Sequence, residues 1–164
     1  MGNLEPLRSG HAEAVLAFER GNRAYFATSI SDRGDAFFEQ FAARFQDSLA
    51  EQDAGNCAFF VRLDDDGEVI GRFNLYDVAN GSAKVGYRVA LCAAGQGIAT
   101  AAVRELCEIA SRLGLHTLTS ATSRGNIASQ KVLTKAGFEP AGEADPSELG
   151  GKQGVRYRRG LSAV

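Results

Sequence analysis

Two glycines near the middle of the chain have the spacing of a site that binds phosphate. Gly95 and Gly97 lie in residues 94–100, which follow an apolar run at 85–91 and open a long helical pattern. The first turn of a helix has backbone N–H groups without partners, and the helix dipole adds about half a positive charge at that end. Glycines let this backbone approach a bulky phosphate with no Cβ between them. We therefore predict that residues 95–100 bind a pyrophosphate.

Two common phosphate-binding turns do not match this stretch. A mononucleotide P-loop requires GxxxxGK[ST], and no lysine follows Gly97. A dinucleotide-binding turn requires a third glycine and a strand–turn–helix unit near the start of a parallel sheet, whereas a meander precedes this turn. The glycine turn therefore indicates another kind of phosphate compound.

The elements that must position the turn are a strand before it and a helix and strand after it. Apolar residues continue at helical spacing from Ala99 onward, and Gly114 suits the end of that helix. A strand predicted at 116–122 completes a strand–helix–strand unit, whose crossover is right-handed. Asn126 is a strong N-cap for a second helix, which Gly137 ends.

Three strand-like segments precede the turn and are expected to form an antiparallel meander. They span residues 58–63, 68–76 and 84–91. The turn sequences Asp64-Asp65-Asp66-Gly67 and Asn80-Gly81 separate them, and both dipeptides that end in glycine are hairpin signals. The aspartate run lacks the alternating ligands of a calcium-binding loop.

The N-terminal third is predicted to be helical after a short edge strand at 3–8. Ser9 is an expected N-cap for a helix at about 10–20, and phenylalanines at helical spacing predict another at 37–49. The aromatic stripe favours a core position, and the alternative is one wall of an acceptor groove. The remaining predicted elements are a strand from Phe138, a glycine-rich mobile loop at 146–152 and a last strand at about 154–161.

This order of elements predicts a single domain over residues 1–164. The expected fold class is mixed α/β (α+β), with a mainly antiparallel sheet flanked by helices. A hydrophobic content of 45% and a charged content of 23% are ordinary for a globular protein. The net charge of −2 and a pI near 5.7 give no electrostatic footprint for nucleic acid. No signal peptide or membrane-length apolar run is present, so we expect a cytoplasmic protein with no membrane partner.

The cysteines and histidines do not form a metal-binding pattern. Cys57, Cys92 and Cys107 are odd in number and lack CxxC spacing, which favours reduced thiols. His11 and His116 are isolated from each other and from the cysteines, so no metal site is expected. Arginines that alternate near the C-terminus are expected to form the solvated face of a strand; they are Arg156, Arg158 and Arg159.

Two short blocks together resemble the GNAT acyltransferase superfamily. Residues 95–100 look like its motif A, Arg/Gln-x-x-Gly-x-Gly/Ala, with the two small positions on Gly97 and Ala99. Residues 126–138 resemble the Asn-x-x-Ser…Leu-x-Lys-x-Gly-Phe signature of the Rim-type branch, the ribosomal-protein N-terminal acetyltransferases. Residues 18–23 look like the N-terminal region of that branch. The order of the blocks and the meander before them make the combination more specific than either block alone.

The resemblance implies a GNAT-like fold in which a splayed strand pair holds acetyl-CoA, with no metal. The implied donor-binding residues are Val89, Gly95, Gln96, Gly97, Ile98, Ala99, Thr100 and Asn126. Val89 would act through its backbone, and Asn126 would contact the pantetheine arm in addition to capping its helix. Ser129 is implied as the catalytic group that hydrogen-bonds the sulfur and donates the leaving proton. The alternative is a serine that satisfies local backbone groups.

The chain departs from the family pattern at two positions. The Arg/Gln position of motif A falls on Ala94, so donor binding must depend more on backbone amides than on a side chain. Many GNAT enzymes have a tyrosine acid seven residues after the asparagine, and that position is Leu133 here. This second departure leaves Ser129 as the better candidate acid.

The resemblance implies direct acetyl transfer to an amine, and the Rim-type features point to a protein or peptide N-terminal α-amine. A small-molecule amine, such as an antibiotic or a polyamine, and a non-catalytic acyl-CoA-binding module stay open as alternatives. A homodimer is also left open. We assign no general base, because surface positions are expected for the candidate carboxylates Glu19, Glu139 and Glu143. Asn74 and Tyr76 are expected to line the acceptor side.

Overall fold

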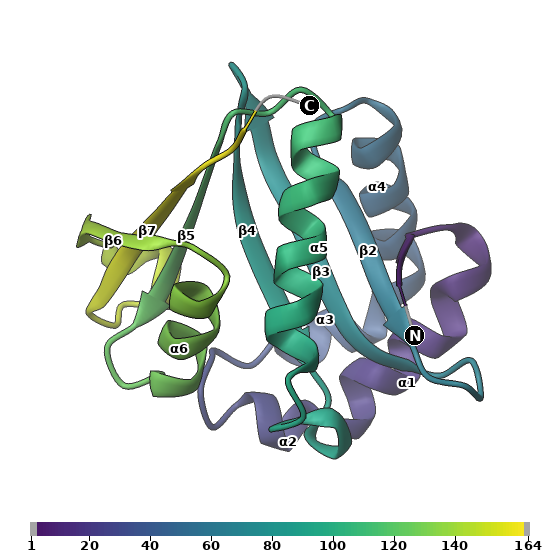
Figure 1. Cartoon of the computed structure of the whole chain (residues 1–164). Coiled ribbons are helices and arrows are strands. Elements are labelled where there is room, and N and C mark those ends of the chain that lie inside the picture. Colours follow the sequence, from purple (N-terminus) through teal and green to yellow (C-terminus); the bar gives the residue numbers. More distant parts are fainter. Residues whose placement is uncertain (1–2, 163–164) are drawn as a thin grey trace.

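A computed structural model describes residues 3–162 of the protein (Figure 1). Its centre is a seven-stranded sheet with the order β1-β2-β3-β4-β5-β7-β6. Neighbouring strands pair antiparallel, except that β4 and β5 pair parallel. The strands are β1 (Leu4–Pro6), β2 (Ala58–Leu63), β3 (Val69–Ala79), β4 (Ser82–Val89), β5 (Thr117–Ser123), β6 (Glu139–Glu143) and β7 (Gly154–Gly160). The predicted mixed, mainly antiparallel sheet is confirmed.

Helices cover both faces of the sheet (Figure 1). The apolar sides of α5 and α6 pack on one face, around a core that contains Phe73 and Leu118. The helices α1, α2 and α4 pack on the other face, around Val61 and Val69. The α-helices are α1 (Ala12–Gly21), α2 (Arg23–Phe26), α3 (Asp35–Glu39), α4 (Phe41–Asp53), α5 (Ile98–Arg112) and α6 (Ile127–Lys135). Short 3-10 helices are η1 (Ser9–His11), η2 (Leu91–Ala93) and η3 (Pro146–Leu149).

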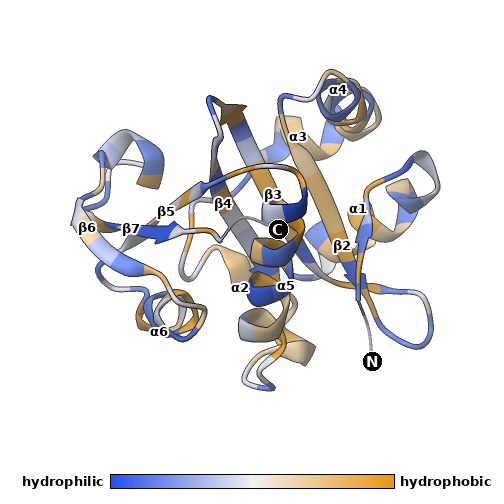
Figure 2. Cartoon of the chain, turned by 45° about the horizontal axis from the view of Figure 1, so that its top comes forward, coloured by the Kyte–Doolittle hydropathy of each residue, from blue (hydrophilic) through white to orange (hydrophobic). Residues whose placement is uncertain are grey.

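Turn residues fix the antiparallel meander β2–β3–β4. Gly67 has φ +80°, and the Asp64 side chain accepts a hydrogen bond from the Asp66 N–H at 2.9 Å. Asn80 and Gly81 both have positive φ, 53° and 76°, as the tight hairpin between β3 and β4 requires. Both turn predictions and the meander are confirmed. Figure 2 shows hydrophobic residues along β2 and hydrophilic residues along β7 at the opposite side of the sheet.

The aromatic stripe forms two helices rather than one. The backbone leaves helical geometry at Gln40, with φ −103° and ψ 17°, so α3 ends and α4 begins at this residue. Phe41 and Phe45 are buried, their ring centroids lie 5.6 Å apart, and Phe37 packs on Phe41 at 5.8 Å. The stripe therefore belongs to the core, as its spacing indicates. The prediction of one continuous helix at 37–49 is wrong, because the segment is divided between α3 and α4.

Two other segments differ from the sequence predictions. The first helical segment begins with η1, and its N-cap is Arg8, so Ser9 lies inside the helix instead of capping it. The glycine-rich segment expected to be a mobile loop contains η3, which the Asp145 side chain caps by accepting a hydrogen bond from the Ser147 N–H at 3.0 Å. Within residues 3–162, no helix combines the length and the apolar character needed to cross a membrane.

Candidate active site

The strands β4 and β5 separate after only three paired residues. Their parallel ladder runs from Ser82–Thr117 to Lys84–Thr119, and the strands then diverge to leave a gap (Figure 1). The last link is made by a side chain, because the buried Ser120 hydroxyl donates to the Val85 carbonyl at 2.8 Å.

Backbone groups of β4 face this gap beyond the last link. Along a strand, successive residues direct their N–H and C=O groups to opposite edges. Ala90 donates its N–H to Ile70 of β3, on one edge, and the Val85 carbonyl faces β5, on the other. The backbone of Tyr87 and Val89 therefore faces the gap, where the ladder offers no partner. Val89 is the position that the resemblance implies for donor contacts.

The glycine turn lies at the open end of this gap and begins α5. Gly95 and Gly97 have φ +75° and +78°, in the left-handed region, and Gly97 is the N-cap. A Cβ built on either glycine would meet no atom within 4 Å, so the space beside the turn is open. The positive φ angles therefore explain why glycine occupies both positions, in addition to the close approach of a phosphate. The first helical bond joins the Ala101 N–H to the Gly97 carbonyl.

The amides of the turn are available to a ligand. Among residues 3–162, none of the N–H groups of residues 95–100 donates to a backbone carbonyl. Residues 94–97 are exposed, and Ile98, Ala99 and Thr100 are half-buried. The Gln96 side chain donates to the Cys92 carbonyl at 3.0 Å and thereby braces the turn. Ala94 brings no polar side chain, in agreement with the departure seen in the sequence.

The opposite wall of the gap is the start of α6. The Asn126 side chain accepts a hydrogen bond from the Ser129 N–H at 3.2 Å, which confirms the N-cap. The Gln130 side chain donates to the carbonyls of Ser123 and Arg124, at 3.2 and 2.9 Å, and ties the loop between β5 and α6 to the helix. Leu133, at the position of the common tyrosine acid, is fully buried in the core.

A tyrosine that the sequence reasoning missed lies across from Ser129. The Tyr87 hydroxyl of β4 is 3.1 Å from the Ser129 Oγ of α6, so a hydrogen bond spans the gap. Burial raises the pKa of Tyr87 to about 12, although its bond to Ser129 lowers it. Because side chains alternate along a strand, Tyr87 could have been predicted to share a sheet face with Val85, but the same pattern is typical of a core residue.

The other face of β3 and β4 carries a row of polar side chains. Arg72, Asn74 and Tyr76 of β3 lie opposite Arg88, Gly86 and Lys84 of β4 in register. A cavity of about 300 Å³ opens on this face beside the point where β4 and β5 separate. Its lining residues are Tyr76, Lys84, Thr119, Ser120, Ala121, Glu148 and Arg156. Of the two residues expected on the acceptor side, Tyr76 therefore lines a cavity and Asn74 lies next to it on the same face.

Lys84, at this cavity, forms ion pairs with two carboxylates. Lys84 Nζ lies 2.9 Å from Glu148 Oε1 and 3.3 Å from Asp77 Oδ2. The bond to Glu148 is the main cause that raises the pKa of Lys84. Burial raises the pKa of Tyr76, whose side chain remains neutral. Glu148 was not among the candidate carboxylates, because nothing local marks a glutamate in a glycine-rich segment.

Two loops meet above this face. A Cβ on Gly150, in the segment between β6 and β7, would collide with the Ser31 Oγ of the loop after α2. A second cavity of about 230 Å³ lies between these loops and the start of α6. Its lining residues are Thr28, Ser29, Ser123, Gly125, Asn126, Lys152 and Gln153. Asn126 therefore borders both the strand gap and this cavity.

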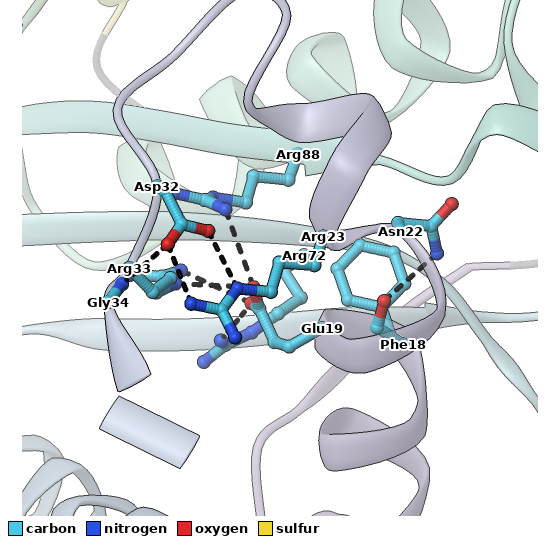
Figure 3. A network of polar contacts seen from close by, with 9 residues as sticks. All are labelled: Phe18, Glu19, Asn22, Arg23, Asp32, Arg33, Gly34, Arg72 and Arg88. Atoms are coloured by element: carbon cyan, nitrogen blue, oxygen red, sulfur yellow. Dashed lines mark hydrogen bonds and ion pairs between the residues drawn. The ribbon is translucent and has the colours of Figure 1, made fainter. Parts of the chain in front are cut away.

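The expectation of a surface position for Glu19 is wrong. Its side chain is 1% exposed, and its carboxylate lies 2.8 Å from Arg72, 3.2 Å from Arg33 and 3.4 Å from Arg88 (Figure 3). Burial opposes ionisation of Glu19, but the three guanidinium groups outweigh it and lower the pKa. Glu19 thus connects α1 with two strands and with the loop that contains Arg33. The other two candidates, Glu139 and Glu143, lie on β6 and are exposed, as predicted.

The family assignment follows from a sequence comparison. A family model described as an acetyltransferase (GNAT) domain matches residues 3–139. The chain belongs to the GNAT acetyltransferase family. The resemblance carried by the glycine turn and the Asn126–Phe138 block is therefore confirmed, and the chain is an N-acetyltransferase of the GNAT type, for which acetyl-CoA is the donor.

Individual relatives agree with this assignment. The "Probable N-acetyltransferase YjcK" of Bacillus subtilis is 29% identical to this GNAT acetyltransferase over 150 residues, which are 86% of this chain and 82% of the relative. The ribosomal-protein-S5-alanine acetyltransferase of Vibrio fischeri has the same fold, with a TM-score of 0.88, 22% identity and coverage of 97% and 92% of the two chains. The ribosomal L7/L12 α-N-protein acetyltransferase RimL, solved in complex with coenzyme A, also shares the fold. Its TM-score is 0.86 and its sequence identity is 20%, and the match covers 98% of this chain and 94% of RimL.

Proposed function

We propose that this chain, acting as a single domain, transfers the acetyl group of acetyl-CoA to the α-amine at the N-terminus of a peptide or protein. The observation that carries the proposal is the gap between β4 and β5, with the exposed amides of residues 95–100 at its open end and Ser129 on its far wall. The polar cavity on the other face of the sheet, beside the start of the gap, offers the acceptor a separate approach.

The residues of the gap fit coenzyme A. The N–H groups of residues 95–100 would hold the pyrophosphate, helped by the dipole of the long helix α5. The backbone of Val89 would pair with the pantetheine arm as an added strand, and the Asn126 amide would contact the same arm. Because Ala94 contributes no cation, these backbone donors carry the binding of the phosphate groups.

Three groups would serve the transfer step. The amine nitrogen attacks the thioester carbon, a C–N bond forms, the C–S bond breaks, and its electron pair goes to sulfur. Ser129 donates its hydroxyl proton to that sulfur. Glu148 takes the proton released by the amine, directly or through water, because it is the carboxylate that lines the cavity on the acceptor face.

The charges of the cavity favour an α-amine over a polyamine or an aminoglycoside. Two cations, Lys84 and Arg156, line it together with one carboxylate, Glu148, which already pairs with Lys84. This balance repels a polycation. It also leaves little capacity to deprotonate an amine whose pKa is about 10, whereas an α-amine has a pKa near 8 and is partly neutral at pH 7. The Rim-type character of the Asn126–Phe138 block and the fold shared with RimL support the same acceptor.

The test is thiol release from acetyl-CoA with three kinds of acceptor. Peptides with a free small residue at the N-terminus are expected to be acetylated, and spermidine and an aminoglycoside are expected to be poor acceptors. Turnover on spermidine or the aminoglycoside, with the peptides inert, would overturn the choice of acceptor. Tight binding of coenzyme A without turnover on any amine would instead favour the alternative of an acyl-CoA-binding module.

A further inference from the structure

Ser129 is held by two hydrogen bonds from different elements. Its N–H donates to the Asn126 side chain, and its Oγ lies 3.1 Å from the Tyr87 hydroxyl. The first bond fixes only the backbone at the start of α6. A serine hydroxyl can still rotate about two bonds and satisfy a local carbonyl instead. The contact with Tyr87 is the hydrogen bond that the Ser129 hydroxyl makes to another side chain, and either oxygen can be its donor.

Tyr87 is itself packed against its neighbours. Its ring stacks on Phe73, with ring centroids 5.8 Å apart and planes 10° apart, and it packs against the core under α5. Among residues 3–162, Ser129 is the one hydrogen-bond partner of the Tyr87 hydroxyl. A pKa of about 12, raised by burial, keeps this hydroxyl protonated at neutral pH, so it remains a hydrogen-bond donor.

We propose that Tyr87 is a positioning residue for acetyl transfer: its hydroxyl donates to Ser129 Oγ and thereby directs the Ser129 hydrogen at the leaving sulfur. The inference rests on the proposed role of Ser129. A hydroxyl oxygen that accepts one hydrogen bond has its own hydrogen free for another partner, and here the free direction is the gap.

The same contact assists the transfer of the proton. As the C–S bond breaks, the Ser129 proton moves to sulfur, and the Tyr87 hydroxyl stabilises the negative charge that develops on Ser129 Oγ. The proton that Glu148 took from the amine then passes through water to Ser129, so the amide and the thiol leave as neutral products and both residues regain their starting protonation.

The test variant is Tyr87→Phe, which removes the hydroxyl and keeps the stacked ring. Its matched control is Tyr157→Phe, because Tyr157 is a buried tyrosine of the same core, and within residues 3–162 the hydrogen bonds of Ser129 go to Asn126 and Tyr87 instead. We expect kcat to fall roughly three- to tenfold in Tyr87→Phe, the range for one lost hydrogen bond. The Kd of coenzyme A, measured by calorimetry, should stay at the wild-type value, and Tyr157→Phe should match the wild type in both quantities.

A double variant separates positioning from a general structural effect. In the Ser129→Ala background, Tyr87→Phe is expected to cause no further loss of kcat, because no hydroxyl remains to be directed. Losses that multiply in the double variant, or a wild-type kcat in Tyr87→Phe, would overturn the inference. The assays use whichever amine the wild type acetylates. A wrong choice of acceptor class would therefore be seen in the acceptor preference of the wild type, and it would not affect the comparison of the Tyr87 and Ser129 variants.

Discussion

Replacement of Gly97 by aspartate tests the phosphate site with a calculable effect. The backbone cost is modest, because a non-glycine residue at φ +78° costs about 1–2 kcal/mol and the Cβ meets nothing within 4 Å. The new carboxylate would stand in the open space beside the turn amides. Its repulsion of one phosphate charge at about 4 Å is about 1 kcal/mol in water and about 4 kcal/mol when partly shielded from water. Since the turn is exposed, we take the lower end of this range.

The expected result is a rise of roughly tenfold in the Kd of coenzyme A, which corresponds to about 1.4 kcal/mol. Calorimetric titration measures it, and higher salt should reduce the difference because the charges are screened. Gly97→Asn has nearly the same shape without the charge and should bind more tightly than Gly97→Asp. Gly67→Asn, at φ +80° in a hairpin turn, controls for backbone strain and should leave the Kd unchanged. Wild-type affinity in Gly97→Asp would refute the reasoning.

Four further predictions concern the buried carboxylate Glu19 and the start of α6. Glu19→Ala should lower the free energy of unfolding, measured by urea denaturation, by about 3–5 kcal/mol, because it leaves buried guanidinium groups unpaired. Glu13 is exposed on the same helix, and Glu13→Ala should change the free energy of unfolding by about 0.5 kcal/mol or less. Equal effects of the two substitutions would contradict the role of Glu19 in the buried cluster. Because the folded-state pKa of Glu19 lies below its ordinary 4.5, its stabilisation is complete above that pH and is lost as the pH falls through the folded-state value. The stability difference between the wild type and Glu19→Gln should therefore shrink with acidification below about pH 4.5. A difference that grows on acidification would mean that the pKa of Glu19 is raised by folding instead of lowered. Asn126→Ala should cost about 1 kcal/mol of stability and weaken coenzyme A binding, whereas Asp145→Ala, at another cap, should spare binding; equal affinities in the two variants would remove Asn126 from the donor site. Ser129→Ala should lower kcat roughly a hundredfold with coenzyme A binding unchanged, and unaltered turnover would remove Ser129 from the mechanism.

The parts of the site that depend on local sequence could be predicted. The glycine turn and the Asn126 cap are each set by a few consecutive residues, whose backbone preferences act over one turn of helix. The two hairpins of the meander were predictable for the same reason. The early separation of β4 and β5 has no local signal, and only the resemblance to the GNAT family indicated it.

The parts that depend on distant contacts could not be predicted. Glu19 reads as a surface glutamate on a helix, and its burial depends on Arg72 and Arg88, which are 53 and 69 positions away. Tyr87 looks like any core residue of an alternating strand until α6 brings Ser129 next to it. Glu148 lines the polar cavity on the β3–β4 face because β7 returns beside β5 and carries the preceding segment with it.

The central claim is that the chain acetylates an α-amine, and the most direct measurement locates the acetyl group on one peptide. A peptide with a free N-terminus and an internal lysine is incubated with the protein and acetyl-CoA, and fragmentation mass spectrometry assigns the modified nitrogen. The account predicts acetylation of the α-amine alone, and no product from the same peptide with a blocked N-terminus. Acetylation of the lysine side chain, with the α-amine left free, would contradict it.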